Sequence, residues 1–284
     1  MMFNGDKFES IKHGENINLK NSYNYINSES EEIEDVNNLR DLGIIISDDG
    51  SFRDQIIKVV KKARRLCGWI DRSFIRNDIY WRRHMLHTYV LPVIDYGSQI
   101  WSPTNQALLN ELESIQRTYT CNTDGLDTFN YWDRLKHMNI QSIQRRHERY
   151  KILYIWKIMN GLVPQCNLNW TDNHRRGKMV TIPGIRTKHC TTAKNMRESS
   201  LAVHGGGIFN LLPANIRNFT GSLNNFKTIL DTFLASIPDK PAINGMYPNP
   251  ISRSTARNSN SISDWILHLG LRDRRLIVND DILS

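Results

Sequence analysis

Apolar residues recur at steps of three and four along most of this chain, which is the spacing of one helix face. Between Asp54 and Ile70 they alternate with lysines and arginines, and the same spacing returns between Tyr80 and Pro92. Pro92 lacks a backbone donor, so we expect the second helix to kink or end there. The pattern predicts further helices over Gln106 to Tyr119, Tyr131 to Met138, Ser142 to Gly161 and Leu223 to Leu234, with a short helical patch near 265–271.

The predicted helix around residues 79–93 is amphipathic and leads into an apolar segment that closes at Trp101. Its basic residues are expected mostly on the faces that point away from the core. We expect Trp101 to be buried where this segment meets the next helix. The apolar face is predicted to hold Ile79, Leu86, Tyr89, Val90 and Val93.

Strand patterns are short and lie mainly near the N-terminus. Residues 3–25 predict short strands broken by glycine and asparagine turns, and residues 44–46 predict a strand that ends in the tight turn Asp48-Asp49-Gly50. Residues 167–200 lack helical spacing and are predicted as strands or loops.

Together these patterns predict a mainly α protein with a small β portion at its N-terminus. We expect four regions along the chain. They are an edge of strands over 1–53, a basic helical region over 54–160, a mixed region over 161–238, and a largely flexible tail over 239–284.

Charge is distributed unevenly along the chain, whose formal net charge is +8. Residues 1–57 hold 5 Lys/Arg against 12 Asp/Glu, a net of −7, whereas the rest holds 32 against 17, a net of +15. Such a basic surface favours an anionic partner, most simply the backbone of RNA or DNA. The alternative is that these charges form solvated helix faces without a partner.

The candidate nucleic-acid contacts lie on the predicted basic helices. Arginines near Ser142 oppose the dipole at the start of a helix, so they call for an external anion or an acidic partner. Contacts to phosphate position a nucleic acid without reading its sequence. The candidate residues are Lys58, Lys61, Lys62, Arg64, Arg65, Arg82, Arg83, Arg145, Arg146 and Arg149.

The sequence gives little support for a metal site, a disulfide or a membrane span. Cys67, Cys121, Cys166 and Cys190 are widely spaced, and His174 and His189 do not form the close ligand pairs of a zinc site. The chain begins without the apolar run of a signal peptide, and no stretch is long and apolar enough for a membrane span. We therefore expect reduced thiols, no bound metal, no membrane contact, and an intracellular location in the nucleus or cytoplasm.

Several motifs resemble, in order, the C-terminal part of reverse transcriptases from non-LTR retrotransposons of the LINE type, the jockey and CR1 kinds. The likeness covers residues 1–238. LPVIDYGSQIWSP resembles the segment after the catalytic palm, LRDLGIIISDDGSF the last palm motif, and RRLCGWIDRSF the helix that enters the thumb. LLNELESIQRTYT, YWDRLKHMNIQSIQRRHERYKILYIWKIMNG and IFNLLPANIRN resemble later segments, with Phe209 in place of a tryptophan.

The resemblance implies a truncated palm edge, a helical thumb-like bundle, and backbone contacts to RNA and DNA. The family's metal-binding carboxylates lie on an aromatic-x-Asp-Asp turn upstream of the matching segment, so we assign no catalytic residue and no cofactor to this chain, although a complete polymerase uses Mg²⁺. Lys7 matches a proton-donor lysine of the family, and its alternative is a solvated lysine at a strand end. Asp48 and Asp49 could be mistaken for a metal pair, but no third carboxylate accompanies them.

Three hypotheses follow from these features. The first is a fragment of a LINE-type reverse transcriptase that binds nucleic-acid backbone but is inactive alone. The second is the back half of a full polymerase whose catalytic half is encoded elsewhere or lost by a truncated gene model. The third is a protein-interaction scaffold with incidental charge.

The first hypothesis predicts that the purified chain, residues 1–284, incorporates no nucleotide on a primed template with Mg²⁺ or Mn²⁺, because the metal-holding carboxylates are expected to be missing. A primer-extension assay measures this directly. Templated incorporation that survives removal of contaminating polymerases would contradict it.

Overall fold

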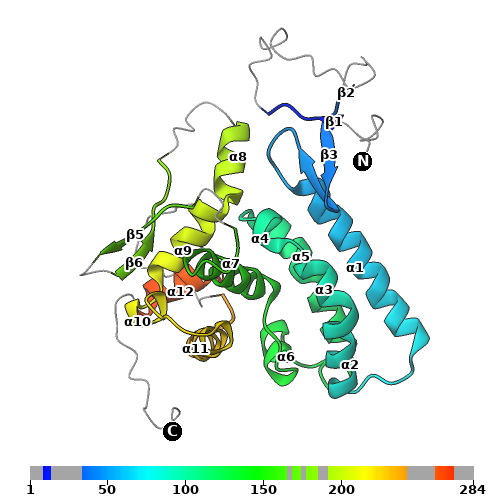
Figure 1. Cartoon of the computed structure of the whole chain (residues 1–284). Helices are drawn as coiled ribbons and strands as arrows, with labels where there is room; N and C mark the ends of the chain where they lie inside the picture. The colour runs from blue at the N-terminus through cyan, green and yellow to red at the C-terminus, as the bar shows by residue number, and fades with distance from the viewer. Residues whose placement is uncertain are drawn as a thin grey trace.

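The computed structural model describes residues 9–13, 34–164, 168–173, 177–184, 191–241 and 260–271. This part of the chain is mainly helical, with short two-stranded sheets, one of them near the N-terminus (Figure 1). The mainly α fold with a small β portion is therefore confirmed. Most of the predicted segment 3–25, including Lys7, lies outside the described residues.

Each described sheet pairs two short strands. β1 (Glu9–Ser10) and β2 (Glu34–Asp35) are parallel, whereas β3 (Asn38–Asp41) and β4 (Ile44–Ser47) form an antiparallel hairpin. Farther along, β5 (Trp170–Asn173) pairs antiparallel with β6 (Gly177–Val180). The predicted strand at residues 44–46 and the turn at 48–50 are confirmed, with Gly50 at φ +67°.

The first helical group follows the predicted pattern closely. Asp78, Asn105, Asn130 and Ser142 cap helices by accepting backbone N–H groups, as small polar residues do at N-caps. The helices are α1 (Arg53–Ser73), α2 (Ile79–Met85), the π-helix η3 (Leu86–Val90), α3 (Leu91–Asp95), α4 (Ser98–Trp101), α5 (Gln106–Cys121), α6 (Tyr131–His137) and α7 (Ile143–Met159).

A second helical group follows β6. It comprises α8 (Thr191–Ser199), the π-helix η4 (Leu201–Gly205), α9 (Gly206–Leu211), α10 (Ala214–Arg217), α11 (Leu223–Ala235) and α12 (Ile262–His268). The prediction of strands or loops throughout residues 167–200 is wrong for α8, whose sequence is dominated by polar residues. A glycine is needed at position 206 because α9 packs tightly on β6: a Cβ there would lie 2.8 Å from Val180 Cγ1.

Two apolar clusters organise the described residues. The first joins α1 to α6 and begins with β4, and the second joins β6, α9, α10, α11 and α12 to the later half of α7. Ile143 at the start of α7 belongs to the first cluster and Ile152 to the second, so α7 connects both, as its position between the two groups suggests (Figure 1). The four regions expected from the sequence stay predictions.

A π-helical turn precedes Pro92 and changes which side of the helix faces the core. Pro92 occupies the first turn of α3, and the N–H of Leu91 reaches five residues back to the carbonyl of Leu86. The wider turn shifts the spacing of the apolar positions. Leu86 and Val90 are fully buried as predicted, but Tyr89 is 42% exposed, so its assignment to the apolar face is wrong.

Part of the predicted flexible tail packs against the second cluster. Ile262 and Ile266 of α12 are fully buried, and the N–H of Ile262 donates to the Glu148 carboxylate over 2.6 Å. The short helical patch expected near residues 265–271 is present as α12 (Ile262–His268), and it packs against the second cluster. The remaining tail residues, 242–259 and 272–284, lie outside the described residues.

Trp101 lies in the first cluster, as predicted. Its side chain is fully buried, its indole N–H donates to the carbonyl of Tyr96 over 2.7 Å, and its ring meets His147 edge-on at 5.4 Å. The indole thus fixes the turn between α3 and α4 against the central helix α7.

We predict that Trp101→Ala lowers the free energy of unfolding by about 3 to 5 kcal/mol, because it leaves a large cavity in a packed core. Chemical denaturation measures the loss. Ile100→Ala is the matched control, since Ile100 is 54% exposed and should change stability little. Equal stability of the two variants would contradict the burial of the indole.

Candidate nucleic-acid interface

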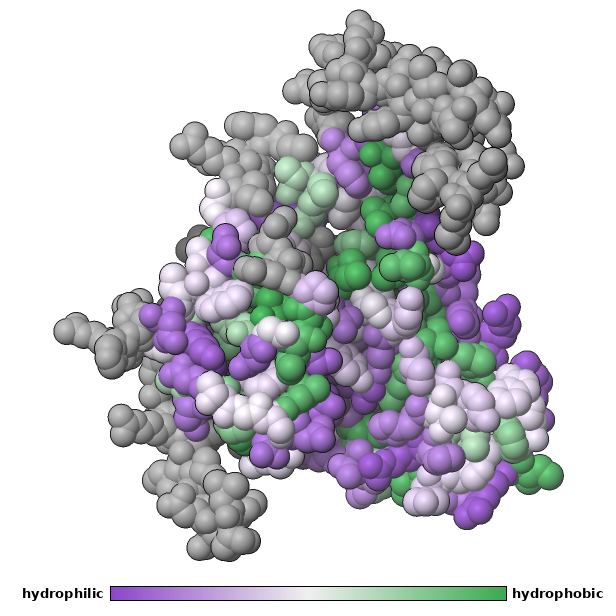
Figure 2. All heavy atoms as spheres, viewed as in Figure 1, coloured by the Kyte–Doolittle hydropathy of each residue, from purple (hydrophilic) through white to green (hydrophobic). Residues whose placement is uncertain are grey.

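A basic stripe runs along the outer face of α1. Lys58, Lys62, Arg65, Trp69 and Arg72 follow one another at steps of four and three, so they lie on one side of the helix. The opposite side is apolar and buried in the first cluster. Figure 2 shows hydrophilic side chains along the edge of the molecule where α1 lies.

The cations of this stripe are not neutralised by neighbouring acids in the described part of the chain. Lys62, Arg65 and Arg72 are exposed, as is Lys61 beside them, and none forms an ion pair there. Lys58 is half-buried, and its Nζ donates to the carbonyl of Gly43 over 2.8 Å. This surface is therefore a row of positive charge that an anion can approach.

The pKa of Lys58 reports how crowded with positive charge this surface is. Partial burial lowers that pKa below its ordinary value, and the nearby charges of Arg40 on β3 and Lys62 lower it further. A second cation raises the cost of protonating the first, so an anion bound between them would be stabilised by both.

Two further predicted contacts, Arg64 and Arg83, lie in the first helical group. Arg64 is exposed on the flank of α1, where its guanidinium donates to the hydroxyl of Ser114 on α5 over 2.9 Å. Arg83 on α2 is half-buried. Both lie on the same helical group as the stripe. The other predicted contacts, Arg82, Arg145, Arg146 and Arg149, are not part of its surface.

Arg82 is buried and serves the fold. Its guanidinium forms an ion pair with Asp71, donates to the carbonyl of Tyr119 over 2.8 Å, and lies 3.8 Å from the centre of the Tyr119 ring. The Tyr119 hydroxyl donates back to the Arg82 carbonyl over 2.9 Å. Because the side chain is 0% exposed, the prediction that Arg82 contacts phosphate is wrong.

The arginines of α7 are also engaged within the protein. Arg145 is buried and donates to the carbonyls of Leu234, Ile237 and Pro238 at the end of α11. Its placement in a nucleic-acid site is wrong for the same reason of burial.

Arg146 and Arg149 are half-buried and each forms an ion pair. Arg146 pairs with Asp95 of α3, and Arg149 pairs with Asp231 of α11 through bonds of 2.5 and 2.7 Å. The pairing with Asp231 raises the pKa of Arg149. The acidic partners that we expected near this helix start are residues of the protein itself, Asp95 and Asp231. Arg146 and Arg149 are therefore engaged within the fold and are not part of the basic stripe.

Further buried ionisable groups surround α7. Burial raises the pKa of Glu113 on α5 to about 7, although it accepts hydrogen bonds from the Tyr131 hydroxyl and from the N–H of Gln144. Burial likewise lowers the pKa of Lys151 to about 8, and its Nζ lies 2.7 Å from Nδ1 of His204. These groups join helices to one another. Because Glu113 and Lys151 are buried, they do not contribute to the surface of the stripe.

The described ranges offer neither a metal site nor a membrane-spanning helix. Within them, no group of three His, Cys, Asp or Glu side chains could hold a metal ion, and no helix is both long and apolar enough to cross a bilayer. Cys67 and Cys121 are free thiols, and burial raises the pKa of Cys67 to about 12. His174, His189, Cys166 and Cys190 lie outside the described residues.

Comparison with known proteins adds one weak likeness. No family model matches the chain, and no solved structure matches it significantly. The chain is similar to an uncharacterized protein of Caenorhabditis elegans, with 28% identity over 133 residues, which is 45% of this chain and 64% of the worm protein. The chain thus spans less than two thirds of the length of the curated relative that it matches.

The sequence analysis missed two residues of the stripe, Trp69 and Arg72, and the neighbouring aromatic residue Tyr89. Trp69 and Tyr89 are 40% and 42% exposed, and their ring centres lie 5.5 Å apart. Arg72 extends the charge to the last turn of α1. Following the steps of four and three from Lys58 would have found Trp69 and Arg72, whereas the exposure of Tyr89 depends on the π-helical turn.

The raised pKa of Glu113 predicts a stability that falls with rising pH. Folding raises that pKa from 4.5 to about 7, so the folded state holds a proton that the unfolded state has released. The free energy of unfolding should fall by about 3 kcal/mol between pH 4.5 and 7 through this group. Glu113→Gln should remove that part of the pH dependence in denaturant titrations.

Glu111→Gln on the exposed side of α5 is the control and should keep the parental pH profile. Comparing the variants cancels other titrating groups, including Glu148, whose pKa burial also raises. Parallel profiles for the parent and Glu113→Gln would contradict a proton held at Glu113.

Proposed function

We propose that this protein binds the backbone of RNA or DNA through the basic stripe of α1, without sequence specificity, and that it corresponds to the C-terminal part of a non-LTR retrotransposon reverse transcriptase. The observation that carries the proposal is the row of unneutralised cations on α1, which contrasts with the paired arginines of α7. The arginines of α7 are held by partners within the fold, whereas Lys61, Lys62, Arg65 and Arg72 are exposed and form no ion pair among the described residues.

The length of the stripe suits a polyanion. Lys58 and Arg72 lie about 21 Å apart along the helix, at a rise of about 1.5 Å per residue. One strand of DNA presents a phosphate about every 3.4 Å along its axis, so about six phosphates fit beside the stripe. A small anion would use one turn of this surface and leave the rest of the charge unneutralised.

The chemistry of the stripe favours phosphate contact over base recognition. Between Lys58 and Arg72 the exposed positions carry lysines and arginines together with Trp69 and Asp71, with neither asparagine nor glutamine, the amides that read adenine edges. Because the apolar side of α1 is fixed in the first cluster, the helix lies along the protein surface. Charge along such a surface positions a nucleic acid and leaves its sequence unread.

The order of the motifs supports the family assignment within this proposal. RRLCGWIDRSF forms the later half of α1, LPVIDYGSQIWSP spans α3 and α4, and LLNELESIQRTYT lies in α5. Each motif thus corresponds to a helix or turn of one packed unit, as expected of a thumb-like bundle.

The test is a salt titration of binding to two duplexes of unrelated sequence. If Lys58, Lys61, Lys62, Arg65 and Arg72 each neutralise one phosphate, the logarithm of affinity should fall with the logarithm of salt with a slope of about −4.5. Lys62→Gln with Arg65→Gln should weaken binding equally for both duplexes and flatten the slope by about 1.8.

Lys136→Gln with Lys157→Gln is the matched control, because it removes the same charge from α6 and α7. Circular dichroism checks that both double variants stay folded. Equal effects of the two variants would reduce the proposal to net charge. An absence of salt-dependent binding in the parent would overturn it in favour of the scaffold hypothesis.

A further inference from the structure

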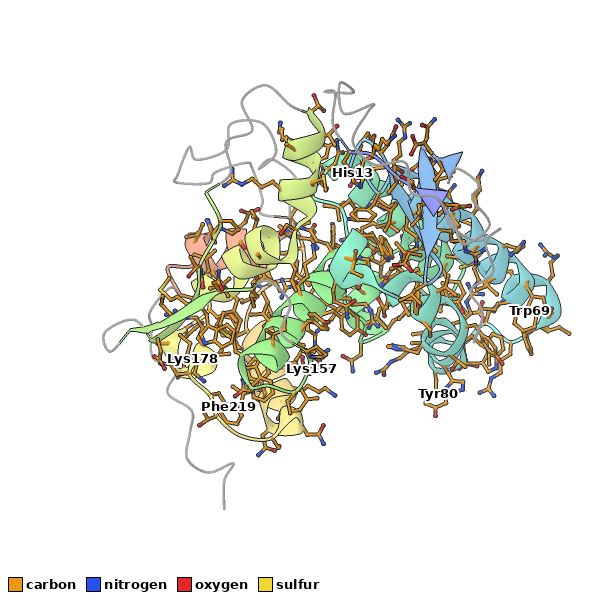
Figure 3. The ribbon with its side chains drawn as sticks, turned by 45° about the horizontal axis from the view of Figure 1, so that its top comes forward. His13, Trp69, Tyr80, Lys157, Lys178 and Phe219 are labelled. Carbon is orange, nitrogen blue, oxygen red and sulfur yellow. The ribbon has the colours of Figure 1, made fainter. Side chains whose placement is uncertain are left out.

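A cluster of aromatic rings lies at the end of the basic stripe. Trp69 of α1 meets Phe74 edge-on at 5.6 Å and Tyr89 of η3 at 5.5 Å, and Phe74 in turn contacts Trp81 of α2 at 4.8 Å. Phe74 and Trp81 pack against the first apolar cluster, whereas Trp69 and Tyr89 reach the surface. Figure 3 shows Trp69 at the outer end of α1.

Trp69 lies within the stripe and is 40% exposed there. It follows Arg65 by four residues and precedes Arg72 by three, so cations lie one turn away on both sides. A Cβ at Gly68 would lie 3.1 Å from Nη1 of Arg72, which places that guanidinium back along the helix toward this turn. The indole is thus an exposed ring at a position of the helix that Arg65 and Arg72 flank.

The geometry of the cluster holds the indole in place while part of it stays exposed. Its contacts with Phe74 and Tyr89 are at interplanar angles of 86° and 70°, so neither ring lies parallel to it. In the described part of the chain no other ring stacks on it. These two contacts hold the ring, and 40% of the side chain stays exposed.

From this arrangement we propose that Trp69, supported by Tyr89, stacks on an unpaired base, so that the surface engages single-stranded nucleic acid more tightly than a closed duplex. This inference rests on the proposed function, because the flanking cations hold the strand by its phosphates. It adds the class of nucleic acid that the stripe prefers.

The preference for an unpaired base follows from which base faces are free. Inside a duplex each base is stacked between its neighbours, and the grooves expose only base edges. An aromatic side chain gains stacking energy only from a face, and all bases offer one in a single strand. Stacking of this kind tolerates any sequence, in agreement with a surface that does not read bases.

The experiment compares a single-stranded oligonucleotide with a hairpin duplex closed by a short loop, both labelled and titrated at a series of salt concentrations. Trp69→Leu keeps the apolar contacts of the ring position but removes the aromatic face. It should weaken binding of the single strand about 5- to 150-fold, the range of one lost base stack, and change hairpin-stem affinity and both salt slopes little. Trp69→Phe should retain most of the single-strand affinity.

Tyr80→Leu is the matched control, since Tyr80 is 79% exposed on α2 and lies apart from Trp69 in Figure 3. It should leave both affinities unchanged. A second measurement uses 5-iodouracil in the single strand, whose photo-crosslink should map to Trp69 in the parent and disappear in Trp69→Leu.

The outcomes separate this inference from the proposed function. A parent that binds neither nucleic acid would overturn both. Salt-dependent binding that Trp69→Leu leaves unchanged, with a crosslink mapping elsewhere, would overturn the stacking inference and leave backbone binding in place. Equal loss for single strand and hairpin would also overturn it, since that result indicates a general contact or a damaged fold.

Discussion

The burial of charge along α7 is the constraint on which the rest of the structure depends. Arg145, Glu148 and Lys151 lie on one helix and are almost completely removed from water. An ion in such a place costs several kcal/mol unless partners surround it. The partners come from distant segments: carbonyls at the end of α11 for Arg145, and the first N–H of α12 for Glu148. Because the buried charges of α7 need these partners, they fix how the two apolar clusters meet.

This constraint also separates the arginines by role. A cation that the fold uses is found with a carboxylate or with several carbonyls, as Arg82, Arg146 and Arg149 are. A cation that the fold does not use remains in water, and the exposed row on α1 is of that kind. Net charge alone cannot distinguish the two sets, because both contribute equally to it. The distinction depends on which face of each helix the apolar clusters bury.

The local sequence pattern was sufficient to predict most helices. It failed where tertiary packing determines the structure. The extents of α1, α5, α6 and α11 follow from apolar spacing and capping residues, which are local properties. The π-helical turn before Pro92 moved Tyr89 to the surface, and the helix over residues 191–199 carries too few apolar residues to reveal itself. At the candidate interface the stripe on α1 was predictable. The burial of Arg82 and Arg145 was not, because it depends on partners such as Tyr119 and Pro238 that are distant in sequence.

The cap of α7 carries a consequence for how the chain is made. Asp239 accepts hydrogen bonds from the N–H and the hydroxyl of Ser142 at 2.7 and 2.6 Å, and Asn260 donates to the same hydroxyl at 2.8 Å. During synthesis the start of α7 leaves the ribosome about 100 residues before these partners, at about 5 to 20 residues per second. For several seconds the charged residues of the central helix lack the partners that they have in the folded protein. The N-terminal bundle can pack as it emerges, but α7 reaches its final state only when the last described segment arrives.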